Sequence, residues 1–103
     1  MYAYNFTGGT KMNITDVHVK KIQVDGKLKG VSSITIDDEF VIHDIKIIEG
    51  NDGLFIAMPS KKTPKGTFRD IAHPISQEAR TQISQLVLEA YEKALLEPDE
   101  DNN

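Results

Sequence analysis

The sequence predicts an α+β fold in which an antiparallel sheet of four to five strands packs against one C-terminal helix. Short segments of alternating apolar and polar residues run from Ile14 to Met58, with turn residues such as Asp25-Gly26 between them. Apolar residues then recur at helical spacing between positions 76 and 96. The chain has 103 residues, which fits one domain with one modest core.

The first two predicted strands form a hairpin around Asp25-Gly26, a pair typical of two-residue turns with positive φ. This turn sets Val17 opposite Ile34 and Val19 opposite Ser32, because the register of a hairpin follows from its turn. The core face is then expected to carry Val17, Val19, Leu28, Ile34 and Ile36. The opposite face is expected to carry His18, Lys20, Lys27 and Lys29, with Ile22 and Val31 among them, and is interpreted as a solvated surface.

The third predicted strand runs from Phe40 to Glu49 and has apolar residues on both faces, as in a central strand. Strict alternation puts Val41, Ile45 and Ile47 on one face and Phe40, Ile42 and Ile48 on the other. Leu54 to Met58 is the fourth predicted strand. In the polar segment from Ser60 to His73, a β-turn is expected at Thr63-Pro64-Lys65-Gly66, followed by a short strand from Phe68 to Ile71.

The C-terminal helix is expected to begin after Ser76, a favourable N-cap residue, and to end near Leu96, before Pro98. Its apolar stripe consists of Ala79, Ile83, Leu86, Val87, Ala90 and Ala94. The simplest interpretation of this stripe is packing against the sheet.

Composition limits the possible functions. The absence of cysteine excludes disulfides, thiolate metal sites and cysteine nucleophiles, and fits a reducing cytoplasm. The net charge is −4, but residues 97–103 contribute four negative charges and no positive one, so residues 1–96 are neutral overall. We interpret residues 97–103 as an acidic disordered tail, 12–96 as the domain, and 1–11 as a leader, either natural or added during cloning.

The residues give no pattern specific to catalysis, a metal or a cofactor. His18, His43 and His73 lack metal-ligand spacing, and neighbours such as His43 and Asp44 point to opposite faces of a regular strand. Ser60, Asp70 and His73 include the residue types of a hydrolase triad, but no nucleophile elbow or glycine-rich phosphate loop is present. We therefore expect no enzyme activity, cofactor, metal or small-molecule substrate, and no segment is long and apolar enough to predict a membrane span.

One segment is strongly basic. Lys61, Lys62, Lys65 and Arg69 fall within nine residues, and the first acidic residue after them is Asp70. Ser60, Thr63 and Thr67 add hydroxyl donors for phosphate oxygens, and the helix N-terminus with Arg80 follows directly. From these residues alone, a phosphate-binding loop and a solvated lysine-rich loop are equal alternatives.

The segment GLFIAMPSKKTPKGTFRDIAHPI, Gly53 to Ile75, resembles the bacterial SpoVG family of stage V sporulation and septation regulators. The resemblance extends upstream through ITDVHVKKIQVDGKLKGVSSITIDDEFVIHDIKIIEGNDG and covers Met12 to about Tyr91. It implies a curved antiparallel sheet with a C-terminal helix and no enzyme activity. It also implies a cytoplasmic, homodimeric regulator of septation, cell division and sporulation that binds DNA and also RNA.

The family's basic loop and early helix carry over onto Lys61, Lys62, Lys65, Arg69 and Arg80. The family often has acidic residues where this chain has Lys65 and Thr67, so the loop is more basic here. Two hypotheses follow: a homodimeric nucleic-acid-binding regulator, or a protein-interaction module of the septation machinery with incidental nucleic-acid affinity. The open edges of a small sheet favour dimerisation, because their unpaired backbone groups can hydrogen-bond to a second chain.

Overall fold

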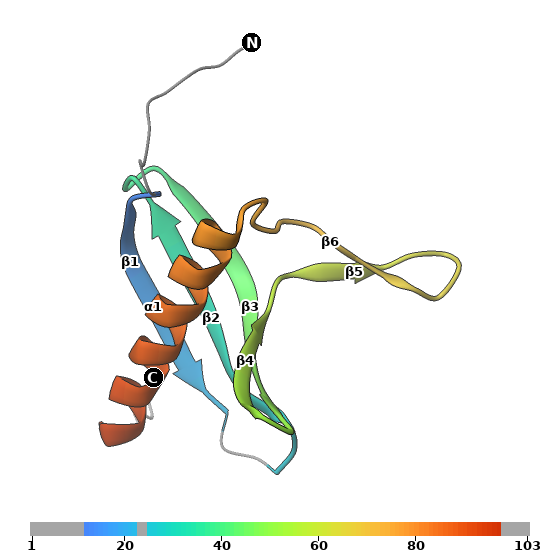
Figure 1. The fold of residues 1–103 in the computed structure, drawn as a ribbon. Helices are drawn as coiled ribbons and strands as arrows, with labels where there is room; N and C mark the ends of the chain where they lie inside the picture. The colour runs from blue at the N-terminus through green and yellow to red at the C-terminus, as the bar shows by residue number, and fades with distance from the viewer. Residues whose placement is uncertain (1–11, 23–24, 98–103) are drawn as a thin grey trace.

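Two antiparallel sheets and one helix make up the part of the fold that the structure describes. The computed structural model describes residues 12–22 and 25–97. The main sheet has the order β1 (Ile14–Lys21), β2 (Leu28–Ile36), β3 (Phe40–Gly50) and β4 (Gly53–Ala57), and a small second sheet pairs β5 (Ser60–Lys62) with β6 (Phe68–Asp70). The helix α1 (Gln77–Leu96) lies across one face of the main sheet (Figure 1). The predicted α+β fold is confirmed.

The β1–β2 hairpin has the register that its turn predicts. Val17 pairs with Ile34 and Val19 pairs with Ser32. Beyond the end of β1 at Lys21, the backbone N–H of Ile22 still donates to the carbonyl of Lys29 at 3.0 Å. The alternating pattern predicts a first strand from Ile14 to Val24, and residues 23 and 24 lie outside the described residues.

A β-bulge in β3 overturns the predicted alternation of that strand. The register against β2 shifts between the pairs Ser32–Ile45 and Ile34–Ile42, and Asp44 adopts a positive φ of 66°. Because a bulge places two residues opposite one, the side chains before it change face relative to those after it. Ile42, not Val41, therefore packs with Ile45 and Ile47, and Val41 is 45% exposed.

The helix begins where its cap residue predicts. The Ser76 hydroxyl accepts a hydrogen bond from the backbone N–H of Ala79 at 3.0 Å, which satisfies one of the free donors of the first turn. Within the predicted stripe Ile83 and Val87 are buried, and Tyr91, which the prediction omitted, is buried with them. No helix in the described ranges is long and apolar enough to cross a membrane.

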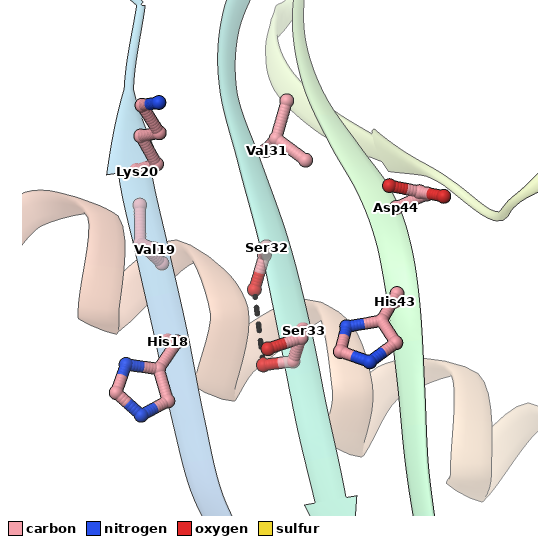
Figure 2. Close-up of a pocket in the computed structure, with 8 residues that line it drawn as sticks. All are labelled: His18, Val19, Lys20, Val31, Ser32, Ser33, His43 and Asp44. Atoms are coloured by element: carbon pink, nitrogen blue, oxygen red, sulfur yellow. Dashed lines mark hydrogen bonds between the residues drawn. The ribbon is translucent and has the colours of Figure 1, made fainter.

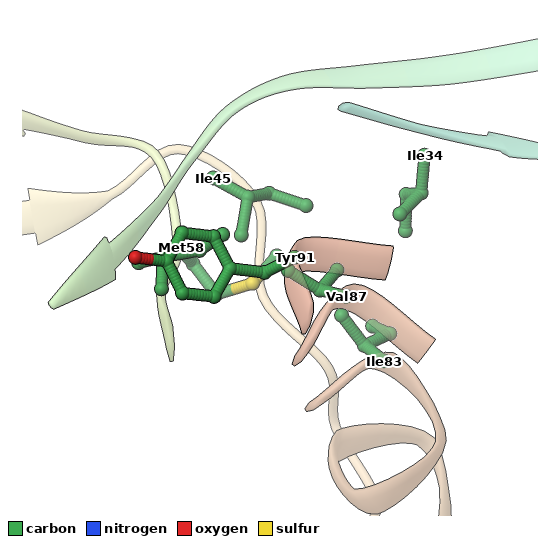
Figure 3. Packing of buried hydrophobic residues seen from close by; sticks show 7 residues of the cluster. Ile34, Ile45, Met58, Ile83, Val87 and Tyr91 are labelled. Atoms are coloured by element: carbon green, nitrogen blue, oxygen red, sulfur yellow. The ribbon is translucent and has the colours of Figure 1, made fainter. Parts of the chain in front are cut away.

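The core lies between α1 and the sheet (Figure 3). Ile34, Ile45, Ile47 and Val87 are fully buried, and each side chain of this size contributes about 1.5–3 kcal/mol by leaving water. Gly30 lies at a tightly packed position within the sheet. A Cβ at this position would lie 3.2 Å from both Ile47 Cδ1 and the carbonyl oxygen of Lys20, but at an ordinary contact distance of 3.5 Å from Tyr91 Cδ1 on the helix.

The second sheet forms an arm, defined here as residues 60–70, that projects away from the rest of the domain (Figure 1). At its base Met58 and Pro59 are buried, and the N–H of Ile71 donates to the carbonyl of Pro59 at 2.7 Å. The predicted strand after the turn is thus present as β6. Its partner β5 was predicted only as a polar segment. The arm is anchored at its base and reaches into solvent.

Candidate nucleic-acid interface

The tip of the arm is a defined turn. The N–H of Gly66 donates to the carbonyl of Thr63 at 2.9 Å, and the N–H of Thr63 donates to the carbonyl of Thr67 at 2.7 Å. Gly66 has a φ of 90°, a conformation that costs glycine little. These bonds describe a three-residue hairpin loop with glycine in the left-handed position. The turn predicted at Thr63 to Gly66 is therefore present.

The strand register of the arm brings two basic side chains together. Lys61 pairs directly with Arg69, so both project from the same face of the hairpin. Both residues are exposed. Like charges at directly opposed positions repel each other, and an anion placed between them would relieve that repulsion. The pair is thus a local site of positive potential.

The other predicted site residues lie apart from this pair. Lys62 pairs with Phe68 and projects from the opposite face of the arm, and Lys65 lies in the turn at its tip. Arg80 is exposed on α1, four residues after the N-cap, while the arm extends away from the body that carries α1 (Figure 1). Four of the five predicted residues therefore share the arm, and Arg80 belongs to the body.

No carboxylate neutralises these cations within the described residues. The ion pairs found there join His18 to Asp16 at 3.2 Å and Lys29 to Glu49 at 3.4 Å. None of the five predicted site residues forms an ion pair in this part of the chain. The single acidic residue of the arm, Asp70, pairs with Ser60 on the face opposite Lys61 and Arg69. The positive charge of the arm is consequently available to an external anion.

Apolar side chains are also exposed on the arm and on the segment that follows it. Phe68 is 69% exposed, Ile71 is 68% exposed and Ile75 is 92% exposed. A two-stranded hairpin is only marginally stable in water without a packed apolar face. The arm thus gains little stability from burial within one chain, which is typical of segments that act by contacting a partner.

A shallow depression of 270 Å³ lies on the face of the main sheet opposite α1 (Figure 2). His18, Ser33 and His43 line it from three neighbouring strands, together with Lys20, Val31 and Asp44. The β3 bulge brings His43 and Asp44 to the same side, contrary to the expectation that they point to opposite faces. No group of three or more potential metal ligands occurs among the described residues, so the depression offers no metal cluster.

The pairing of Lys61 with Arg69 was not predicted, although the sequence contains the signal for it. A loop centred on Lys65 makes opposed positions symmetric about that residue, which places Lys61 opposite Arg69 and Thr63 opposite Thr67. The Pro64 and Gly66 signals were sufficient to predict this pairing. In contrast, the depression on the main sheet depends on the β-bulge in β3, and no glycine in the sequence indicates where that bulge lies.

The fold and the arm together define a class: a small α+β domain with a C-terminal helix and an exposed basic hairpin. The family model described as SpoVG matches residues 12–93. The chain belongs to the SpoVG family.

Curated relatives support this membership. The chain is 64% identical over 86 residues to "Putative septation protein SpoVG" of Clostridium beijerinckii, covering 84% of this chain and 94% of that relative. It is 65% identical over 83 residues to the protein of the same name from Lachnospira eligens, covering 81% of this chain and 94% of that relative. It is 61% identical over 83 residues to "Putative septation protein SpoVG 1" of Listeria monocytogenes, covering 81% of each chain.

Proposed function

We propose that this chain is a non-enzymatic cytoplasmic regulator that binds DNA and also RNA through its arm, and thereby modulates septation, cell division and gene expression. The observation that carries the proposal is the opposed pair Lys61 and Arg69 on an exposed hairpin, without a neutralising carboxylate among the described residues. A nucleic acid can satisfy such a pair, because Lys and Arg neutralise its phosphates and also donate to the base edges of guanine.

The names of the relatives support the septation part of this proposal. Regulation of sporulation would apply where the host forms spores. Lys62 and Lys65 extend the basic surface along the arm, and Arg80 offers a contact beside the helix N-terminus on the body. If all five cations neutralise phosphates, log K should fall with log salt at a slope of about −4 to −5, and each cation that contacts a base instead makes the slope about 0.9 shallower.

A salt series on the full chain tests the role of the arm. The combined variant Lys61→Ala, Lys62→Ala and Lys65→Ala should bind a DNA duplex more weakly than wild type, with a slope about 3 units shallower. A matched variant removes the same charge elsewhere by replacing Lys27, Lys46 and Lys93, which are exposed away from the arm. This control should retain the wild-type slope. Equal slopes for wild type and the arm variant would refute the assignment.

We further propose that the functional unit is a homodimer joined along β4. In the described sheet no strand pairs with the outer edge of β4, and two residues of β4 itself, Leu54 and Phe55, are exposed. Exposed strand edges pair readily with another chain. Two-fold pairing there would place two arms on one assembly. Sedimentation velocity across a concentration series tests this, and a monomer at every concentration would reject it.

A second candidate function is protein interaction within the septation machinery, with nucleic-acid affinity incidental. Its support is apolar exposure on the main sheet away from β4, where Phe40 is 67% exposed and Val41 is 45% exposed. Exposed apolar patches often mark protein contacts. A partner recovered by pull-down after nuclease treatment and at high salt would favour this function, because contacts through nucleic acid would be lost under both conditions.

A further inference from the structure

The two faces of the arm carry different chemistry. Lys61 and Arg69 share one face, and Thr63 and Thr67 continue it toward the tip, where their hydroxyl oxygens lie 2.9 Å apart in a hydrogen bond. We call Lys61, Thr63, Thr67 and Arg69 the polar face. It consists only of side chains that can hydrogen-bond and contains no carboxylate. The opposite face holds the pairs Lys62 with Phe68 and Ser60 with Asp70.

The dimensions of the arm match one groove of duplex DNA. Its two strands are about 4.8 Å apart, as in any antiparallel pair. The major groove, about 12 Å wide and about 8.5 Å deep, admits such a ribbon, whereas the minor groove is only about 6 Å wide. From Ser60 to Pro64 the arm extends about 13 Å at the usual rise per residue, and this length would lie along the groove.

The residue types of the polar face match the base edges in that groove. Arg and Lys donate to O6 and N7 of guanine, and Thr can donate or accept or contact the thymine methyl group. The hydrogen bond between Thr63 and Thr67 holds the tip of the hairpin together, so less conformational freedom is lost on binding. On the opposite face of the arm, Lys62 would point away from the bases, where it could contact a flanking phosphate.

We propose that the polar face reads base edges in the major groove of duplex DNA, with the arm lying in the groove as a two-stranded ribbon. This inference rests on the proposed nucleic-acid-binding function and specifies its ligand. The major groove of A-form RNA is deep and too narrow for side-chain readout. The arm therefore discriminates duplex DNA from duplex RNA.

Modified guanines test which groove is used. The probe is a G·C-rich DNA duplex of two helical turns, about 20 base pairs, prepared with guanine, with 7-deazaguanine or with inosine. The first replacement removes the N7 acceptor from the major groove, and the second removes the amino group from the minor groove. For the full chain at fixed salt, fluorescence anisotropy should show 7-deazaguanine weakening binding about tenfold and inosine leaving it within about twofold.

Two single variants supply a matched control, because Arg69→Ala and Lys62→Ala remove one positive charge from opposite faces of the same hairpin. Arg69→Ala should lose most of the discrimination between guanine and 7-deazaguanine. Lys62→Ala should weaken binding to both duplexes equally and keep the discrimination. Circular dichroism of each variant confirms that the fold is retained.

The outcomes separate this inference from the proposed function. Equal affinity for the guanine and 7-deazaguanine duplexes, with salt-dependent binding intact, overturns groove readout but leaves nucleic-acid binding standing. An RNA duplex of the same sequence bound as tightly as the DNA duplex also overturns it. Absence of binding to every duplex and to single strands contradicts the proposed function itself.

Discussion

The body of the domain and its arm are stabilised in different ways. In the body, α1 covers the main sheet and buries Ile34, Ile45, Ile47 and Val87 completely. In the arm, Phe68 is exposed and the directly opposed pair Lys61 and Arg69 carries like charge. The body thus gains free energy from burial, whereas the arm depends on a tight turn and on the hydrogen bonds between its strands.

This difference supports the proposed role of the arm. Cations without an ion pair among the described residues, together with exposed apolar groups, contribute little to the stability of the arm itself. The same groups are suited to contacting a polyanion. The body anchors the arm through the buried Met58 and Pro59, and the arm carries the residues of the proposed interface. Substitutions in the two regions should therefore have separable effects.

The largest effect on stability is expected for Ile45→Ala in the body. Ile45 is fully buried at the bulge of β3, and truncating such a side chain leaves a cavity. The free energy of unfolding should fall by about 2–5 kcal/mol, as measured by urea denaturation. Val41→Ala, on the same strand but exposed, is the matched control and should change it by at most about 0.5 kcal/mol. Similar losses of unfolding free energy for both variants would show that the bulge does not place Ile45 in the core and Val41 on the surface.

An intermediate effect is expected for Ser76→Ala, where the segment after the arm enters α1. Losing the bond from the Ala79 N–H to the Ser76 hydroxyl should lower the free energy of unfolding by about 1 kcal/mol. Ser76→Gly should cost only a few tenths of a kcal/mol, because glycine leaves the helix end accessible to water. Thermal and urea unfolding of both variants measure the difference. An alanine variant as stable as wild type would rule out a stabilising cap.

The smallest effect on stability is expected for Phe68→Ala in the arm. With the side chain 69% exposed, the free energy of unfolding should change by at most about 0.5 kcal/mol. Because the proposed dimer joins along β4, sedimentation velocity should show the same association for the variant and for wild type. A loss of stability that grows with protein concentration would instead show that a second copy covers the arm.

Local signals in the sequence determined much of this fold. Asp25-Gly26 gave the correct pairing of β1 with β2, and Ser76 marked the start of the helix. Pro64 and Gly66 located the turn of the arm. These features depend on residues close together in the chain, whose backbone preferences act without help from the rest of the molecule. Four of the five predicted site residues share one hairpin for the same reason.

Tertiary structure decided the remaining features. The bulge at Asp44 exchanged the positions of Val41 and Ile42, because packing Ile42 with Ile45 and Ile47 against the helix requires a break in alternation. Tyr91 and Met58 entered the core where α1 packs against the sheet. The direction in which the hairpin leaves the body, which carries Arg80 on α1, also depends on the tertiary structure (Figure 1). Each of these outcomes follows from contacts between residues far apart in sequence, which local preference cannot encode.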